Sequence, residues 1–132
     1  MKDEMPLLSV FMITYNHEKH IAEAIESALM QKTSFKYEIV IGEDCSTDQT
    51  REIVLEYATR YADKVKPIYQ ERNVGANKNA ASVREACKGK YIALLEGDDY
   101  WIDPLKLQKQ VDFLEAHPDF SICSHKSKIR RY

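Results

Sequence analysis

At 132 residues the chain is long enough for one domain with a buried core, and it is too short for two. Hydrophobic residues make up 44% and charged residues 30%, as in a globular protein, and no apolar run approaches the ~20 residues that a membrane helix needs. The formal net charge of −2 gives no general attraction to nucleic acid or acidic membranes. We therefore expect no nucleic-acid partner and no membrane span in this chain.

Apolar residues recur with a period that switches repeatedly between strand and helix, and this pattern predicts the fold. Two short apolar runs, Leu8–Ile13 and Glu38–Gly42, are typical of strands covered on both faces. Three more strands are expected at residues 65–69, 91–95 and 120–123.

Helices are expected between these strands. The first covers residues 21–29 with Asn16 as its cap, and the second begins after Ser46 or Asp48. The third and fourth are expected over residues 78–87 and from Asp103 to just before Pro118. Alternation of strands and helices with short connections predicts an α/β fold, with a mostly parallel sheet and helices on both faces, in a single domain over residues 1–132.

The three cysteines are an odd number and lie far apart, at positions 45, 87 and 123. This spacing argues against a disulfide framework and predicts a reducing compartment, and hence a cytoplasmic protein. Four basic residues cluster near the end of the sequence: Lys126, Lys128, Arg130 and Arg131. We interpret them as a solvated segment or the start of a linker, the alternative being a contact with phosphate or with the inner face of a membrane.

Polar segments follow each of the first four predicted strands. They are Thr14–His17, Glu43–Asp48, Arg72–Asn79 and Glu96–Trp101. In a parallel sheet, ligands bind beyond the carboxyl ends of the strands, and these ends share one edge of the sheet. Since the second and fourth segments are densely acidic, we predict a ligand site at this edge.

Asp98 and Asp99 lie side by side just after the fourth strand, where Gly97 allows the chain to bend. Two carboxylates a few ångströms apart repel each other unless a cation or proton intervenes. Mg²⁺ or Mn²⁺, which bind carboxylates together with phosphate oxygens, would resolve this repulsion and would neutralise a leaving diphosphate. A solvated acidic turn is the simpler alternative, and it is favoured if the pair is considered alone.

Asp44 follows the second strand, and its carboxylate can accept a hydrogen bond from an N–H of a base such as uracil. The alternative role is to cap the next helix, for which Ser46, Thr47 and Asp48 are also available. His17 and His20 lie one helical turn apart, but no third ligand has a matching spacing, so we interpret them as surface histidines on a helix. Trp101 either stacks on a sugar or anchors the following helix in the core.

With these residues in place, the chain resembles the family 2 glycosyltransferases from about Leu8 to His125. The resemblance rests on four segments in order: S-V-F-M-I-T-Y-N-H (9–17), I-V-I-G-E-D-C-S-T-D (39–48), R-N-V-G-A-N-K-N (72–79) and Y-I-A-L-L-E-G-D-D-Y-W (91–101). Each segment is weak alone, but their order and separations are specific. The resemblance implies a Rossmann-like GT-A fold, of which this chain would be the N-terminal, nucleotide-sugar-binding portion.

The resemblance also implies roles for individual residues. Ile13 and Tyr15 would line the base, and Asp44 would bind it, with uracil the expected base. Asp98 would hold the ribose, Asp99 would coordinate Mn²⁺ or Mg²⁺ at the diphosphate, and Lys78 would reach a phosphate; these six positions are the expected donor site.

The sequence departs from the family pattern at several positions. Glu43 stands where the family often has an aspartate, and Cys45 stands where it often has a glycine, which puts a close approach of backbone and ligand in doubt. The segment Asn77–Asn79 replaces the usual Ala-Arg-Asn. No residue matches the general base of inverting members, so no catalytic residue is predicted, and we expect the chain to be truncated at its C-terminal end.

The leading hypothesis is a glycosyltransferase that moves a sugar from a nucleotide-diphosphate donor, most simply a UDP-sugar, to a saccharide or other hydroxyl acceptor. The reaction would be metal-assisted and inverting. The alternative is a nucleotide-binding module that lacks turnover on its own. A dinucleotide-dependent enzyme is disfavoured because no G-x-G-x-x-G follows the first strand.

Overall fold

The computed structural model describes residues 5–123, so the basic residues of the tail lie outside the described part. The elements are, in order, β1 (Leu8–Thr14), α1 (Ile21–Leu29), β2 (Tyr37–Glu43), α2 (Thr50–Arg60), β3 (Val65–Tyr69), α3 (Ala76–Ala86), β4 (Tyr91–Leu94) and α4 (Lys106–Ala116). Among the described residues, no helix has both the length and the apolar character needed to cross a bilayer.

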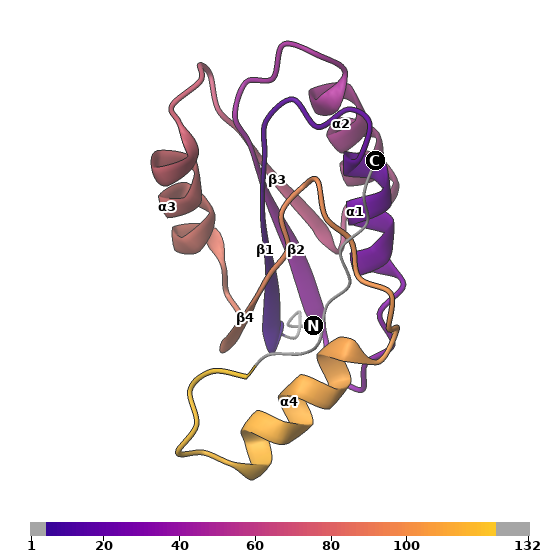
Figure 1. Cartoon of the computed structure of the whole chain (residues 1–132), viewed down its shortest axis with the longest axis vertical. Coiled ribbons are helices and arrows are strands. Elements are labelled where there is room, and N and C mark those ends of the chain that lie inside the picture. The colour runs from indigo at the N-terminus through magenta and orange to yellow at the C-terminus, as the bar shows by residue number, and fades with distance from the viewer. Residues whose placement is uncertain (1–4, 124–132) are drawn as a thin grey trace.

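The strands form one parallel sheet in the order β3-β2-β1-β4. Leu8 of β1 is level with Tyr37 of β2 and with Tyr91 of β4, so the central strands start together. The carboxyl ends of all four strands consequently lie along one edge of the sheet, as the sequence predicts. This edge carries the loops that lead into the helices (Figure 1).

Helices cover both faces of the sheet, which confirms the predicted architecture. α1 and α2 lie on one side and α3 on the other (Figure 1). Alternate residues of the buried strands face the two layers. Met12 and Ile41 belong to the main core together with Ile25 of α1, whereas Gly42 faces α3 so closely that a Cβ there would overlap Asn79 and Val83.

The predicted fifth strand at Phe120–Cys123 is wrong. These residues have no regular structure, and Ile122 is 83% exposed. The ring of Phe120 instead packs on Phe113 and His117 of the α4 end, with centroids 5.5 and 5.6 Å apart. The short apolar run thus packs locally on the preceding helix and does not reach the sheet.

The predicted cap of α1 is also wrong. Asn16 has a φ of 54°, and its Oδ1 accepts the Thr47 N–H at 2.8 Å, so it ties two loops together. α1 begins at Ile21 without a side-chain cap. At the start of α2, Asp48 accepts the Thr50 N–H at 2.9 Å.

Trp101 anchors the chain before α4. Its side chain is 6% exposed and belongs to the main core, together with Leu107 and Val111 of that helix. The Lys106 ammonium lies over its ring, 4.6 Å from the centroid. Of the two roles considered for this residue, the structure favours the anchor over a sugar contact.

The two edge strands differ in how they resist the addition of a further strand. β3 contains Lys66 and Pro67, and a charge and a proline both oppose such pairing. β4 contains neither, and its Ile92 and Leu94 are 46% and 72% exposed. By register, their side chains share a face with Phe11 of β1, so within residues 5–123 β4 is an apolar edge strand without these protective residues.

Replacing Leu94 with lysine should therefore raise the protein concentration at which the chain associates. The charge would oppose strand addition at β4, while the free energy of unfolding should change by no more than about 0.5 kcal/mol because the site is exposed. Light scattering over a concentration series measures the association, and Leu55→Lys on α2, also an exposed leucine at 53%, is the matched control. An equal effect of both variants would contradict a specific role for the β4 edge.

Candidate functional site at the carboxyl ends of the strands

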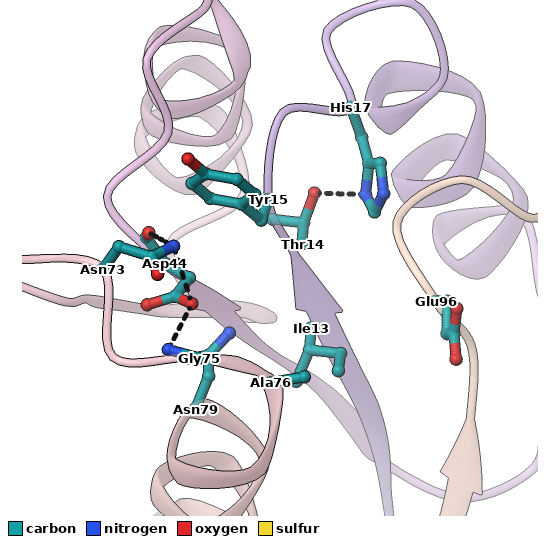
Figure 2. Close-up of a pocket in the computed structure, with 10 residues that line it drawn as sticks. All are labelled: Ile13, Thr14, Tyr15, His17, Asp44, Asn73, Gly75, Ala76, Asn79 and Glu96. Atoms are coloured by element: carbon teal, nitrogen blue, oxygen red, sulfur yellow. Dashed lines mark hydrogen bonds between the residues drawn. The ribbon is translucent and has the colours of Figure 1, made fainter.

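A pocket of about 390 Å³ opens where the carboxyl ends of β1, β2 and β4 meet the start of α3 (Figure 2). Its lining residues are Ile13, Thr14, Tyr15, His17, Asp44, Asn73, Gly75, Ala76, Asn79 and Glu96. All of them except Ile13, the last residue of the first predicted strand, come from the four polar segments that the sequence predicts at this edge. Among the predicted donor-site residues, the structure brings Ile13, Tyr15 and Asp44 to the pocket.

Asp44 is 3% exposed and fixes the loop that leads into α3. Its Oδ1 accepts the Val74 N–H at 2.8 Å, and its Oδ2 accepts the Gly75 N–H at 3.0 Å and the Asn73 side-chain amide at 3.2 Å (Figure 2). Gly75 has a φ of 91°, a backbone angle that residues other than glycine rarely adopt. The Asp44 carboxylate and the glycine together set the position of the loop against the pocket.

Glu43, the residue before Asp44, is fully buried and turns the other way, toward α2. Its Oε2 pairs with Nε of Arg51 on α2, and its Oε1 accepts the Ser46 N–H at 2.9 Å. Arg51 also donates to the Gln70 carbonyl at 2.6 Å. The glutamate therefore holds the ends of β2 and β3 and the start of α2 together, a role that needs its charge.

Cys45 has a φ of 58°, in the left-handed region that favours glycine. A glycine, which the family often has at this position, would adopt this conformation without strain. Its Sγ contacts the Glu71 carbonyl at 3.7 Å. The cysteine at this position therefore costs backbone strain.

His17 is not a surface histidine on a helix, as the sequence was interpreted. It lies before α1, its side chain is 24% exposed, and its ring lines the pocket. Its Nδ1 shares a hydrogen bond with the buried Thr14 hydroxyl at 2.9 Å (Figure 2). Gly97 packs directly against both side chains: a Cβ there would lie 2.5 Å from Thr14 Oγ1 and 2.9 Å from His17 Nδ1. Gly97 is thus needed for this close approach.

Asp98, Asp99 and Lys78 are exposed and are not among the residues that line the pocket. Asp98 lies next to it, because its Oδ2 is 3.8 Å from Nε2 of His17. Asp99 Oδ1 accepts the N–H of Tyr100 at 2.9 Å. Lys78 lies in the first turn of α3, and the structure does not bring it to the pocket wall.

The described residues contain no group of three or more His, Cys, Asp and Glu side chains that could hold a metal ion by themselves. Mg²⁺ and Mn²⁺ are often bound by only one or two carboxylates, with water and phosphate oxygens filling the other positions. The exposed Asp99 carboxylate, which has one oxygen committed to a backbone N–H, fits this kind of site. A phosphate-bearing ligand would then complete the coordination.

Sequence reasoning missed Thr14, His17, Ala76, Asn79 and Glu96 as lining residues. Thr14 and Glu96 each follow a predicted strand directly, so their position at the edge of the sheet could have indicated that they line the pocket. Asn79 lies one turn into α3 and is 1% exposed, and its amide donates to the Gly42 carbonyl at 2.9 Å. Nothing in the sequence pattern distinguishes that asparagine from its exposed neighbours.

The chain belongs to the family 2 glycosyltransferases, because the family described as Glycosyl transferase family 2 matches residues 9–130. An uncharacterised protein of Mycobacterium tuberculosis is 44% identical over 122 residues, which are 92% of this chain and 35% of that protein. The UDP-Glc:alpha-D-GlcNAc-diphosphoundecaprenol beta-1,3-glucosyltransferase WfaP of Escherichia coli is 35% identical over 116 residues, 88% of this chain and 44% of WfaP.

Among solved structures, S. aureus TarS 1–349 in complex with UDP is similar, with a TM-score of 0.73 and 32% identity. The similarity covers 84% of this chain and 32% of that one. It confirms the Rossmann-like GT-A fold expected from the sequence. The chain thus spans less than half of the length of each of these relatives.

Replacing Asp44 with asparagine should loosen the loop before α3. The amide group offers one acceptor oxygen in place of two, so it cannot accept all three donors, and hydrogen bonds to a charged group contribute about 1.5–3 kcal/mol each. Hydrogen exchange followed by NMR should show faster exchange of the Val74 and Gly75 amides, with the β2 core amides less affected. Unchanged exchange at both loop amides would contradict the anchoring role of Asp44.

Replacing Cys45 with glycine should raise the free energy of unfolding by up to about 1 kcal/mol. The left-handed conformation costs an L-residue roughly 1–2 kcal/mol, and the added freedom of glycine in the unfolded chain cancels part of the gain. Urea denaturation measures the difference. Cys87→Gly is the matched control, because Cys87 has an ordinary φ of −68° and should lose stability; a loss of stability in both variants would show that position 45 is not strained.

Proposed function

We propose that this chain forms the donor half of a glycosyltransferase, binding a UDP-sugar whose sugar is then transferred to a hydroxyl of a saccharide or other acceptor. The proposal combines family membership with the pocket at the carboxyl ends of the strands. TarS, similar in fold at 32% identity, was solved with UDP, and WfaP is named as using UDP-Glc. Both names favour uracil as the base and a nucleotide diphosphate as the donor.

Asp44 is the residue that we propose to recognise the base. A carboxylate has about four lone-pair positions, and the loop donors occupy three of them, two on Oδ2 and one on Oδ1. One position on Oδ1 is left for a further donor, as the N–H of uracil would supply. Tyr15 lies at the pocket with its side chain 41% exposed, suited to packing against a flat base (Figure 2).

The observation that carries the proposed metal dependence is the charge of the pocket lining. It contains the carboxylates of Asp44 and Glu96 and no lysine or arginine. A diphosphate entering such a pocket would be repelled unless a cation came with it. We propose that Asp99 holds Mn²⁺ or Mg²⁺ at the diphosphate, where the ion would act as a Lewis acid for the leaving group.

The chain's own residues would then bind and orient the donor. Asp44 and Tyr15 would hold the base, Asp98 the ribose, and Lys78 would approach a phosphate if its long side chain bends over the start of α3. We propose an inverting transfer, with the general base outside the residues that the structure describes. We further propose a cytoplasmic protein that works at the inner face of a membrane, consistent with the lipid-linked acceptor in the name of WfaP.

Calorimetric titration of UDP, with and without Mn²⁺, tests the proposed function. We expect binding with metal, weak or no binding without it, and a preference over ADP and GDP. Asp99→Ala should abolish the effect of the metal. Asp63→Ala is the matched control, since Asp63 is exposed and lies just before β3, at the opposite end of the sheet, and it should leave binding unchanged.

Three other outcomes of this titration would contradict parts of the proposal. A folded protein that binds no UDP in the presence of metal would contradict the proposed donor site. Preference for GDP with the same metal dependence would keep the site and refute uracil as the base. Equal losses from Asp99→Ala and Asp63→Ala would show that the effect is general electrostatics and would refute the assignment of the metal to Asp99.

A further inference from the structure

We infer that His17 is a positioning residue that orients the Asp98 carboxylate toward the ribose of the bound nucleotide; this inference rests on the proposed function. His17 lines the pocket, and its Nε2 is 3.8 Å from Asp98 Oδ2. That separation is too long for a hydrogen bond but short enough for electrostatic attraction between an N–H and a carboxylate. Among the described residues, His17 is the side chain within ion-pair distance of Asp98.

His17 is held in place both at its backbone and at its ring. Its backbone N–H donates to Oγ1 of Thr50 at 2.8 Å, and Thr50 is fully buried at the start of α2. The Thr50 hydroxyl in turn donates to Asp48 at 2.6 Å. Burial tends to raise the pKa of Asp48, but hydrogen bonds from Thr50 and from the backbone N–H groups of Glu18 and Asp48 outweigh it and hold that pKa below its ordinary value, so the acceptor stays charged.

The hydrogen bond at the ring determines which nitrogen faces Asp98. Nδ1 meets the hydroxyl of Thr14, which is 2% exposed, and Gly97 packs against both groups. A carboxylate can only accept, so both neighbours are satisfied when Thr14 donates to Nδ1 and the ring carries its proton on Nε2. The ring then presents an N–H to Asp98 from a fixed position.

Asp98 itself needs such a partner. Its turn is fixed at the backbone, where Gly97 N–H donates to the Ile13 carbonyl at 3.1 Å and Asp99 N–H donates to the Glu96 carbonyl at 3.0 Å. Its side chain is 48% exposed, so packing does not select one rotamer. The His17 N–H attracts the carboxylate toward the pocket side of the turn, where a ribose would lie next to a base held at Asp44.

The test compares UDP with 2′,3′-dideoxy-UDP, which lacks the ribose hydroxyls, by titration calorimetry in saturating Mn²⁺. Loss of a hydrogen bond to a charged group predicts that wild type binds UDP about ten-fold more tightly than the dideoxy ligand. Asp98→Ala should bring this ratio to about one. His17→Asn, which can still accept the Thr14 hydroxyl but is too short to reach Asp98, should lower the ratio most of the way toward that of Asp98→Ala.

His17→Gln is the rescue variant, because its longer side chain can again place an N–H near Asp98, and it should restore most of the ratio. A purely structural role for His17 would weaken both ligands equally and leave the ratio unchanged, which would overturn the inference. A wild-type ratio near one would also overturn it, even with tight UDP binding. Failure of wild type to bind either ligand would instead refute the proposed function itself, so the two failures are distinguishable.

Discussion

The site depends on two adjacent carboxylates at the end of the central strand β2 that turn in opposite directions. Glu43 reaches Arg51 and the Ser46 N–H on the side of α2, and Asp44 reaches the Val74 and Gly75 N–H groups on the side of α3. Both are almost completely buried, at 0% and 3% exposure. Buried charges are stable only where donors satisfy them, so each carboxylate fixes the loop that supplies its donors.

Because the two carboxylates point in opposite directions, the end of β2 orders two loops that lie far apart in the sequence. The loop after β2 must turn sharply between the two acids, and the left-handed conformation of Cys45 provides this turn. The loop before α3 must bring two successive backbone N–H groups to one carboxylate, and the conformation of Gly75 allows it. Of the two acids only Asp44 lines the pocket, together with Asn73 and Gly75 of the loop that it anchors.

Much of this arrangement could be predicted from the sequence. Parallel strands, helices on both faces and a polar edge follow from the switching apolar period and from the polar segments after each strand, and these features are local. Ile13, Tyr15 and Asp44 reach the pocket because they follow or end strands whose carboxyl ends must share an edge. Strand position predicted the edge at which they lie, and the family resemblance selected these residues from it.

The predictions from sequence that proved wrong share one cause. Asn16 has the composition of a helix cap, yet it bonds to Thr47 in another loop, 31 residues away. His17 has the spacing of a surface helix residue, yet Thr14, Thr50 and Gly97 hold it against the pocket. Phe120 has the apolarity of a strand residue, yet it packs on the end of α4. In each case a contact between segments decides the outcome, and local propensity contains no information about such a contact.

The acidic edge is stable because most of its carboxylates have their own donors. Glu43 has Arg51, Asp44 has loop N–H groups, Asp48 has Thr50, and Asp99 has the Tyr100 N–H. Glu96 lines the pocket, and its carboxylate has no such partner among the described residues. The negative charge that remains uncompensated is thus concentrated at the pocket mouth, beside Asp98 and Asp99. Under the proposed function these charges would repel a diphosphate that arrived alone, so a divalent cation would have to enter with the nucleotide or ahead of it.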